Sequence, residues 1–289
     1  MRGPMPLFRT QTFRDDICLE AMEMLAWQIR AFGAPHLPRV PTVLSRWTAL
    51  SSMRRELDDM RDAGAWAQDT FARVLQEARM EDWNVECVPA DTAASVGVAA
   101  TTMATRWGSG AMGAIHGNLR GNPVVLYRGS DVEEAGRFPL VAMLQLATLR
   151  MASCARPDGY SPERHAWWVA STAVFGGAGP DLLNLEEMVA QLGQEHGMVR
   201  RADAQDLTAA VEMMTVMAMR VRRLTPEQMI ASYGQVMSKG FRKRVRAICD
   251  GIDRHTAELK LLQSLSDGRM CNASAQVELR TPVRAQLAG

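Results

Sequence analysis

The C-terminal third of the chain contains a spacing pattern that fits one kind of secondary structure. Seven side chains recur there at alternating intervals of four and three residues: Phe241, Val245, Ile248, Ile252, His255, Leu259 and Leu262. Because residues three and four apart share one face of an α-helix, the pattern predicts a helix with a seam of the coiled-coil type. Two alternatives stay open: the seam packs against the chain's own core, or it forms an interface with a second copy or another protein.

Helix signals also cover most of the chain before this segment. Apolar residues recur at helical spacing over about 13–32, 44–62 and 65–81, and residues 137–152 are apolar over a helical length. Thr225-Pro226-Glu227-Gln228 is a capping box with proline at the first helical position, and Gly240 is expected to separate that helix from the last one. The sequence therefore predicts a mainly α, multi-helix protein.

A short region in the middle follows a different period. Trp83, Val85 and Cys87 alternate with polar residues, and residues 123–127 form an apolar run rich in valine. Both patterns are typical of strands, so we expect a small β element around residues 83–130. Three parts follow: an N-terminal helical portion with the β element (1–155), a C-terminal helical portion with a basic segment (156–266) and a flexible tail (267–289).

Composition excludes several classes of protein. The 289 residues are 47% hydrophobic, enough to bury a core without a metal or disulfide staple. The five cysteines form no CxxC pair, which argues against a zinc ribbon and a disulfide framework. The sequence shows no signal peptide and no apolar run of membrane-spanning length. We therefore expect a cytoplasmic protein with no membrane partner.

The net charge of +1 hides an uneven distribution. Eight basic residues and one acidic residue, Glu227, give the segment 220–246 a charge of +7, and the other 25 basic and 31 acidic residues give −6. The basic residues are Arg220, Arg222, Arg223, Lys239, Arg242, Lys243, Arg244 and Arg246. Clustered Lys and Arg favour nucleic acid because phosphate contacts release counterions. The alternative is a segment neutralised within the fold or by an acidic protein surface.

No motif predicts catalysis. The glycines of Gly108-Ser109-Gly110-Ala111-Met112-Gly113 match GxGxxG, and Asp131 lies near the position of a ribose-binding acid. Residues 114–122 are too short and too rich in glycine for the crossover helix of a dinucleotide site, so a flexible loop is the better interpretation. HExxH, GxSxG and GxxxxGK motifs are absent. The sequence thus predicts no catalytic residue, no cofactor and no metal site.

The order of elements in the middle of the chain resembles that of the ImmA/IrrE metallopeptidases. Short strands end at residues 124–127, Arg137-Phe138 opens an apolar helix, and Pro162-Glu163-Arg164-His165 opens another. In that family the helix after Arg-Phe carries the HExxH zinc site. Residues 140–146 contain no metal ligand here. The resemblance therefore implies a degenerate metallopeptidase-like scaffold over about residues 83–180.

These observations lead to two functional hypotheses. The first is a non-enzymatic binding or assembly protein that acts through helical surfaces and contacts nucleic acid through the basic segment 220–246. The second is an enzyme, or a degenerate metallopeptidase-like scaffold, with a site near the loop 108–113 and the helix that starts at residue 162. A homo-oligomer or a protein partner is compatible with either hypothesis.

Overall fold

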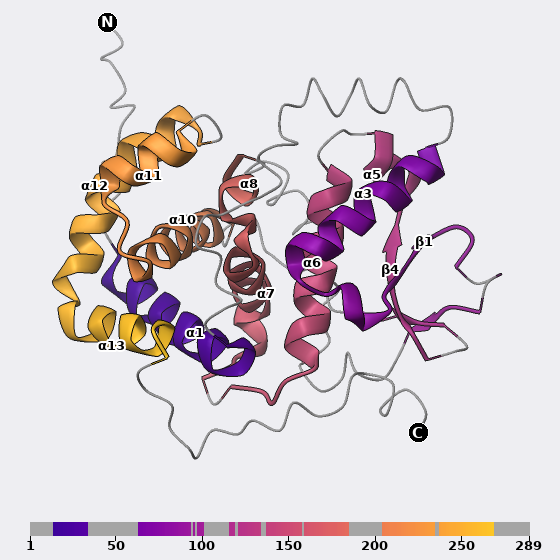
Figure 1. Ribbon diagram of the computed structural model, residues 1–289, viewed down its shortest axis with the longest axis horizontal. Helices are drawn as coiled ribbons and strands as arrows, with labels where there is room; N and C mark the ends of the chain where they lie inside the picture. Colours follow the sequence, from indigo (N-terminus) through magenta and orange to yellow (C-terminus); the bar gives the residue numbers. More distant parts are fainter. Residues whose placement is uncertain are drawn as a thin grey trace, which may run out of the picture.

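A computed structural model shows how the chain is arranged. It describes residues 14–33, 63–93, 95, 97–100, 116–118, 121–133, 137–157, 159–184, 204–234 and 237–268. Helices dominate these residues, and a small sheet lies at the end of the molecule opposite α11, α12 and α13 (Figure 1). The predicted fold class, mainly α with a small β element, is confirmed.

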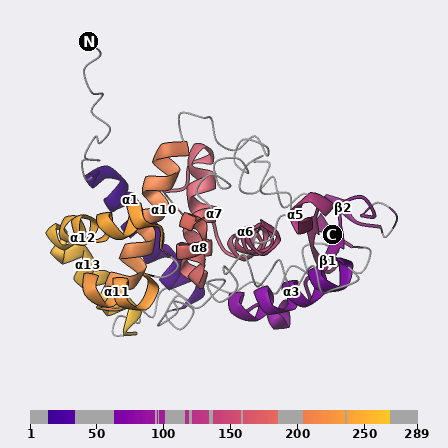
Figure 2. The ribbon, with the colours of Figure 1, turned by 90° about the horizontal axis from the view of Figure 1, so that it is seen from above.

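The helices include both amphipathic segments and segments that are buried on nearly all sides. They are α1 (Asp15–Phe32), α3 (Ala63–Ala78), α5 (Gly129–Glu133), α6 (Arg137–Ala152), α7 (His165–Ala173), α8 (Gly179–Asn184), α10 (Ala204–Val221), α11 (Pro226–Tyr233), α12 (Lys239–Arg254) and α13 (Thr256–Ser266). Helix α6 packs on α7 on one side and on α3 and β4 on the other, and so joins the two ends of the molecule (Figure 2).

The sheet has the strand order β1-β4-β3-β2. Its strands are β1 (Glu86–Pro89), β2 (Ala99–Ala100), β3 (His116–Gly117) and β4 (Pro123–Tyr127). Strands β1 and β4 are parallel, with Cys87 opposite Val125, and the other two pairings are antiparallel. The strand predicted from Trp83 starts later than expected because Glu81–Trp83 forms a 3-10 turn and Asn84 is left-handed, with a φ of 50°.

A single cluster of buried side chains runs through the described residues. It extends from Ile17 in α1 to Leu262 in α13 and includes residues from both of the predicted helical portions. Helices α6 and α7, on either side of the predicted boundary near residue 155, pack directly against each other. The predicted tail lies outside the described residues except for Asp267 and Gly268.

The predicted seam is part of this core. Phe241, Val245, Ile248, Ile252, Leu259 and Leu262 are all buried within the one chain, as in the alternative of a seam that packs on its own domain. The prediction of one continuous helix is wrong at His255, where φ is −92° and ψ is 54° and α12 gives way to α13. This break directs α13 onto α1 and α10, and His255 Nε2 lies 3.1 Å from Asp15 Oδ1.

The predicted separation at Gly240 is also wrong. Helix α11 ends at Tyr233, and the side chain of Ser238 caps α12 by accepting a hydrogen bond from the backbone N–H of Phe241 at 3.1 Å. Gly240 therefore lies in the first turn of α12. The serine side chain satisfies a backbone N–H in the first turn of the helix, so α12 begins at this cap and not after Gly240.

Candidate nucleic-acid interface

The candidate interface lies on the three helices that form one end of the molecule, α11, α12 and α13. Helix α11 starts at the predicted capping box. The Thr225 hydroxyl accepts from the backbone N–H of Gln228 at 3.2 Å, and the Gln228 side chain accepts from the N–H of Thr225 at 2.8 Å. This reciprocal pair fixes where the chain leaves the α10–α11 turn and turns toward α12.

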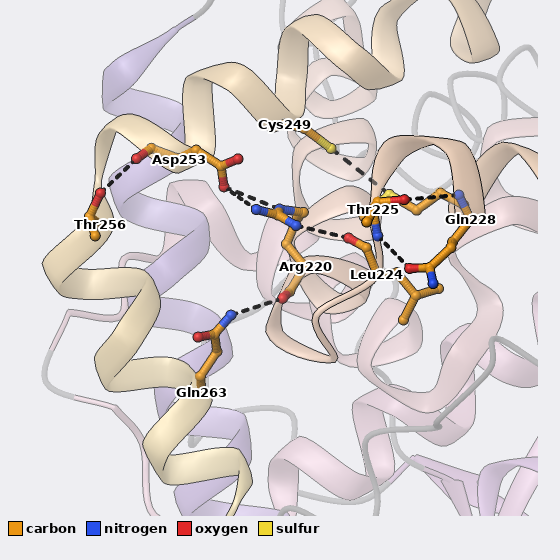
Figure 3. A network of polar contacts seen from close by, with 9 residues as sticks. Arg220, Leu224, Thr225, Gln228, Cys249, Asp253, Thr256 and Gln263 are labelled. Atoms are coloured by element: carbon orange, nitrogen blue, oxygen red, sulfur yellow. Dashed lines mark hydrogen bonds and ion pairs between the residues drawn. The ribbon is translucent and has the colours of Figure 1, made fainter.

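The basic residues at the end of α10 are bound within the fold. Arg220 Nε donates to Asp253 Oδ1 at 3.1 Å and its Nη1 donates to the Leu224 carbonyl at 2.9 Å (Figure 3). Gln263 of α13 donates to the Arg220 carbonyl at 3.2 Å. Arg223 Nη2 lies 2.7 Å from Asp267 Oδ2. These contacts join α10 to α12 and α13, so both arginines have a structural role, and Arg222 beside them is half-buried.

Arg244 is also engaged inside the chain. Its guanidinium binds the carboxylate of Glu212 on α10 in a bidentate pair, with Nε 2.9 Å from Oε2. Glu212 is only 4% exposed. A buried carboxylate needs a partner of opposite charge, and Arg244 supplies it. The side chain therefore fastens α12 to α10.

The remaining basic residues form one surface, which we call the basic stripe: Lys239, Arg242, Lys243 and Arg246. All four are exposed, and their spacing of three, four and seven residues from Lys239 places them on one face of α12. Arg246 Nη2 lies 3.2 Å from Glu227 Oε1, but both side chains are more than 60% exposed. Such a surface pair is weak, and another anion can easily replace its carboxylate.

The basic stripe is placed against the electrostatic preference of its helix. A helix N-terminus carries a partial positive charge and favours acidic side chains, by about 0.3–1 kcal/mol each. The first turn of α12 contains no acidic residue, and the exposed Asp250 lies near its C-terminal end. Helix stability therefore does not explain why Lys239, Arg242 and Lys243 cluster at this end.

Two residues of the alternative enzyme site have structural partners. Asp131 accepts from the Nε of Arg137 at 2.9 Å and from the backbone N–H of Arg128, and it is buried. His165 Nδ1 lies 3.0 Å from the Tyr160 hydroxyl, and burial lowers the pKa of His165. The loop 108–113 lies outside the described residues.

The part of the chain that the structure describes contains neither a metal-binding cluster nor a membrane-spanning helix. No group of three or more His, Cys, Asp or Glu side chains there is arranged to hold a metal ion. No helix there has the length and apolarity needed to cross a lipid bilayer.

Sequence reasoning identified the basic segment but not its division into two sets. Arg220, Arg223 and Arg244 are paired with acids 32 to 44 residues away, so their partners have no local signal: they are Asp253, Asp267 and Glu212. The basic stripe does have a local signal, because its members repeat at helical spacing.

Comparisons with known proteins do not assign the chain to a family. No protein-family model matches it, and neither the curated proteins nor the solved structures give a significant match. The resemblance to the ImmA/IrrE metallopeptidases therefore stays a prediction from element order.

Proposed function

We propose that this protein is a non-enzymatic binding protein that contacts nucleic acid through the basic stripe of α12. One observation carries the proposal: four basic side chains share the exposed face of a helix whose opposite face is held in the core. Phe241, Val245 and Ile252 are at most 1% exposed, so the helix is a fixed support. The stripe is presented to the solvent without needing a conformational change.

The chemistry of the stripe suits phosphate. Arg242 supplies a planar set of donors for phosphate oxygens, and Lys239 and Lys243 supply compact charges on either side. Each phosphate contact releases counterions, so affinity falls steeply as salt rises. Arg246 joins these contacts when phosphate replaces its exposed partner, Glu227.

The test is a charge reversal with a matched control. R242E/K243E changes two residues of the stripe, whereas R30E/K260E makes the same change in charge at two exposed positions on α1 and α13. Binding to a labelled nucleic acid is followed by fluorescence anisotropy over a salt series. We expect R242E/K243E to weaken binding by roughly tenfold or more and to reduce the salt slope by about 2, with R30E/K260E close to wild type.

Two results would overturn the proposal. The first is no binding by the wild-type protein at low salt. The second is a salt-sensitive dimer, measured by light scattering without nucleic acid, that R242E/K243E dissociates while nucleic-acid binding is unchanged. In that case the stripe binds acidic side chains of a second copy. Circular dichroism and thermal unfolding of both variants establish that they are folded.

A further inference from the structure

We infer that the nucleic acid is duplex DNA and that α12 enters the major groove through its N-terminal half. This inference rests on the proposed function and adds the class of partner and the direction of approach. Three observations carry it: the lack of exposed aromatic rings among the described residues, the length of the basic stripe, and the acidic residue that follows the stripe on the same face of α12.

The first observation concerns single strands. Proteins that bind single-stranded nucleic acid stack successive bases on aromatic side chains, which contribute about 1–3 kcal/mol per base. None of the aromatic residues in the described ranges is exposed. The aromatic residue of α12 is Phe241, which is 1% exposed and packed in the core. The basic stripe therefore offers charge and hydrogen bonds but no stacking platform.

The second observation concerns the shape of the stripe. Lys239 and Arg246 are seven residues apart on α12, which corresponds to about 10 Å along the helix axis. The major groove of B-DNA is about 12 Å wide and admits an α-helix with phosphates on both sides. The major groove of A-form RNA is deep and too narrow for side chains to read. The stripe therefore fits the groove of duplex DNA better than that of duplex RNA.

The third observation fixes the direction of approach. Asp250 is exposed and lies eleven residues after Lys239, which returns it to nearly the same angle around the helix axis. The face that is basic over residues 239–246 thus carries an acidic residue one turn later. A carboxylate near the DNA backbone is repelled by the phosphates. Contact is therefore confined to the first two turns of α12, with the acidic end directed away from the DNA.

The first test compares nucleic acids. Anisotropy is measured for a DNA duplex about two helical turns long, for an RNA duplex of the same sequence and for each single strand, all at the same low salt. We expect the DNA duplex to bind roughly tenfold more tightly than the others. Equal binding of single strands or of duplex RNA, still abolished by R242E/K243E, would overturn this inference and leave the proposed function standing. No binding to any of the four would overturn both.

The second test addresses the direction of approach. D250K extends the basic stripe by one turn, and D82K makes the same change in charge at an exposed position near the sheet. We expect D250K to tighten binding to duplex DNA by roughly threefold or more and to increase the salt slope by about 1, with a smaller effect of D82K. Equal affinity of the two variants would show that the charge at residue 250 does not limit the contact between α12 and the DNA, which overturns the proposed approach.

Discussion

Charge is held differently in a buried ion pair near the sheet and in the basic stripe at the other end of the molecule. At the sheet end, Asp131 and Arg137 are each 6% exposed and pair at 2.9 Å. On α12, Lys239, Arg242 and Lys243 have the same sign and face the solvent. A buried charge must have a partner because desolvation is costly, whereas an exposed charge is stabilised by water. The buried pair therefore holds the fold together, whereas the exposed residues are available to a ligand.

Removal of Asp131 is expected to cause the largest loss of stability. D131A leaves the Arg137 guanidinium buried without its carboxylate, which costs about 3–5 kcal/mol, and it also removes the acceptor for the Arg128 N–H. Denaturant unfolding followed by circular dichroism measures the change. The matched change on the other side of the comparison is E227A, which removes the exposed partner of Arg246 and should have little effect on the free energy of unfolding. Equal losses of stability in D131A and E227A would show that the buried pair does not hold the fold together more than the exposed pair does.

The sequence predicts those features of this contrast whose residues lie close together along the chain. Helical spacing over residues 239–246 predicts the basic stripe, and the residues from Thr225 to Gln228 predict the start of α11, because both signals are local. The pair between Arg244 and Glu212 joins residues 32 positions apart. No local pattern encodes such a contact, so the eight basic residues could not be sorted into bound and exposed sets in advance.

The break at His255 was likewise not predictable from local spacing. The alternation of four and three residues continues through it, and a straight helix satisfies that pattern as well as two helices do. The packing of α13 against α1 and α10 determines that the segment forms two helices. The periodicity carries no information about this packing. Tertiary contacts therefore override a local helix signal here.

Gln145 provides the next prediction at the sheet end. Its side chain accepts from the N–H of Leu126 at 3.0 Å and donates to the carbonyl of the same residue at 2.6 Å. The Gln145 side chain thus pairs with both backbone groups of Leu126 in β4, as a neighbouring strand would. Q145A leaves both backbone groups without these bonds and should lower the free energy of unfolding by about 2 kcal/mol. Q76A, at an exposed position on α3, is the control and should have little effect.

The capping box tests the helices that support the basic stripe. T225A removes the acceptor for the N–H of Gln228 and should cost about 1 kcal/mol, measured by the same denaturant unfolding. S232A, at an exposed position within α11, is not expected to destabilise the protein. If T225A also weakens nucleic-acid binding as much as R242E/K243E does, the position of α12 depends on α11, and packing in the core alone does not hold the basic stripe in place.

The smallest expected difference concerns two buried thiols, one at each end of the molecule. Burial raises the pKa of Cys87 in β1 and of Cys249 in α12 from 9.0 to about 12. Because the fold favours the protonated thiol, its contribution to stability is fully present below pH 9 and is lost as the pH rises toward 12. Thermal unfolding over this range should show stability falling. C87A and C249A, compared with wild type over the same range, should each reduce that dependence on pH.

Alkylation at about pH 8 then distinguishes the two ends. With Cys271 replaced by serine, we expect the half-buried Cys154 to react first, and Cys87 and Cys249 to react slowly and at similar rates. Peptide mapping by mass spectrometry assigns the label. If Cys249 reacts as fast as Cys154, α12 opens locally in the native state. The basic stripe would then lie on a mobile helix, and its exposed charges would no longer be held in the fixed geometry that groove binding requires.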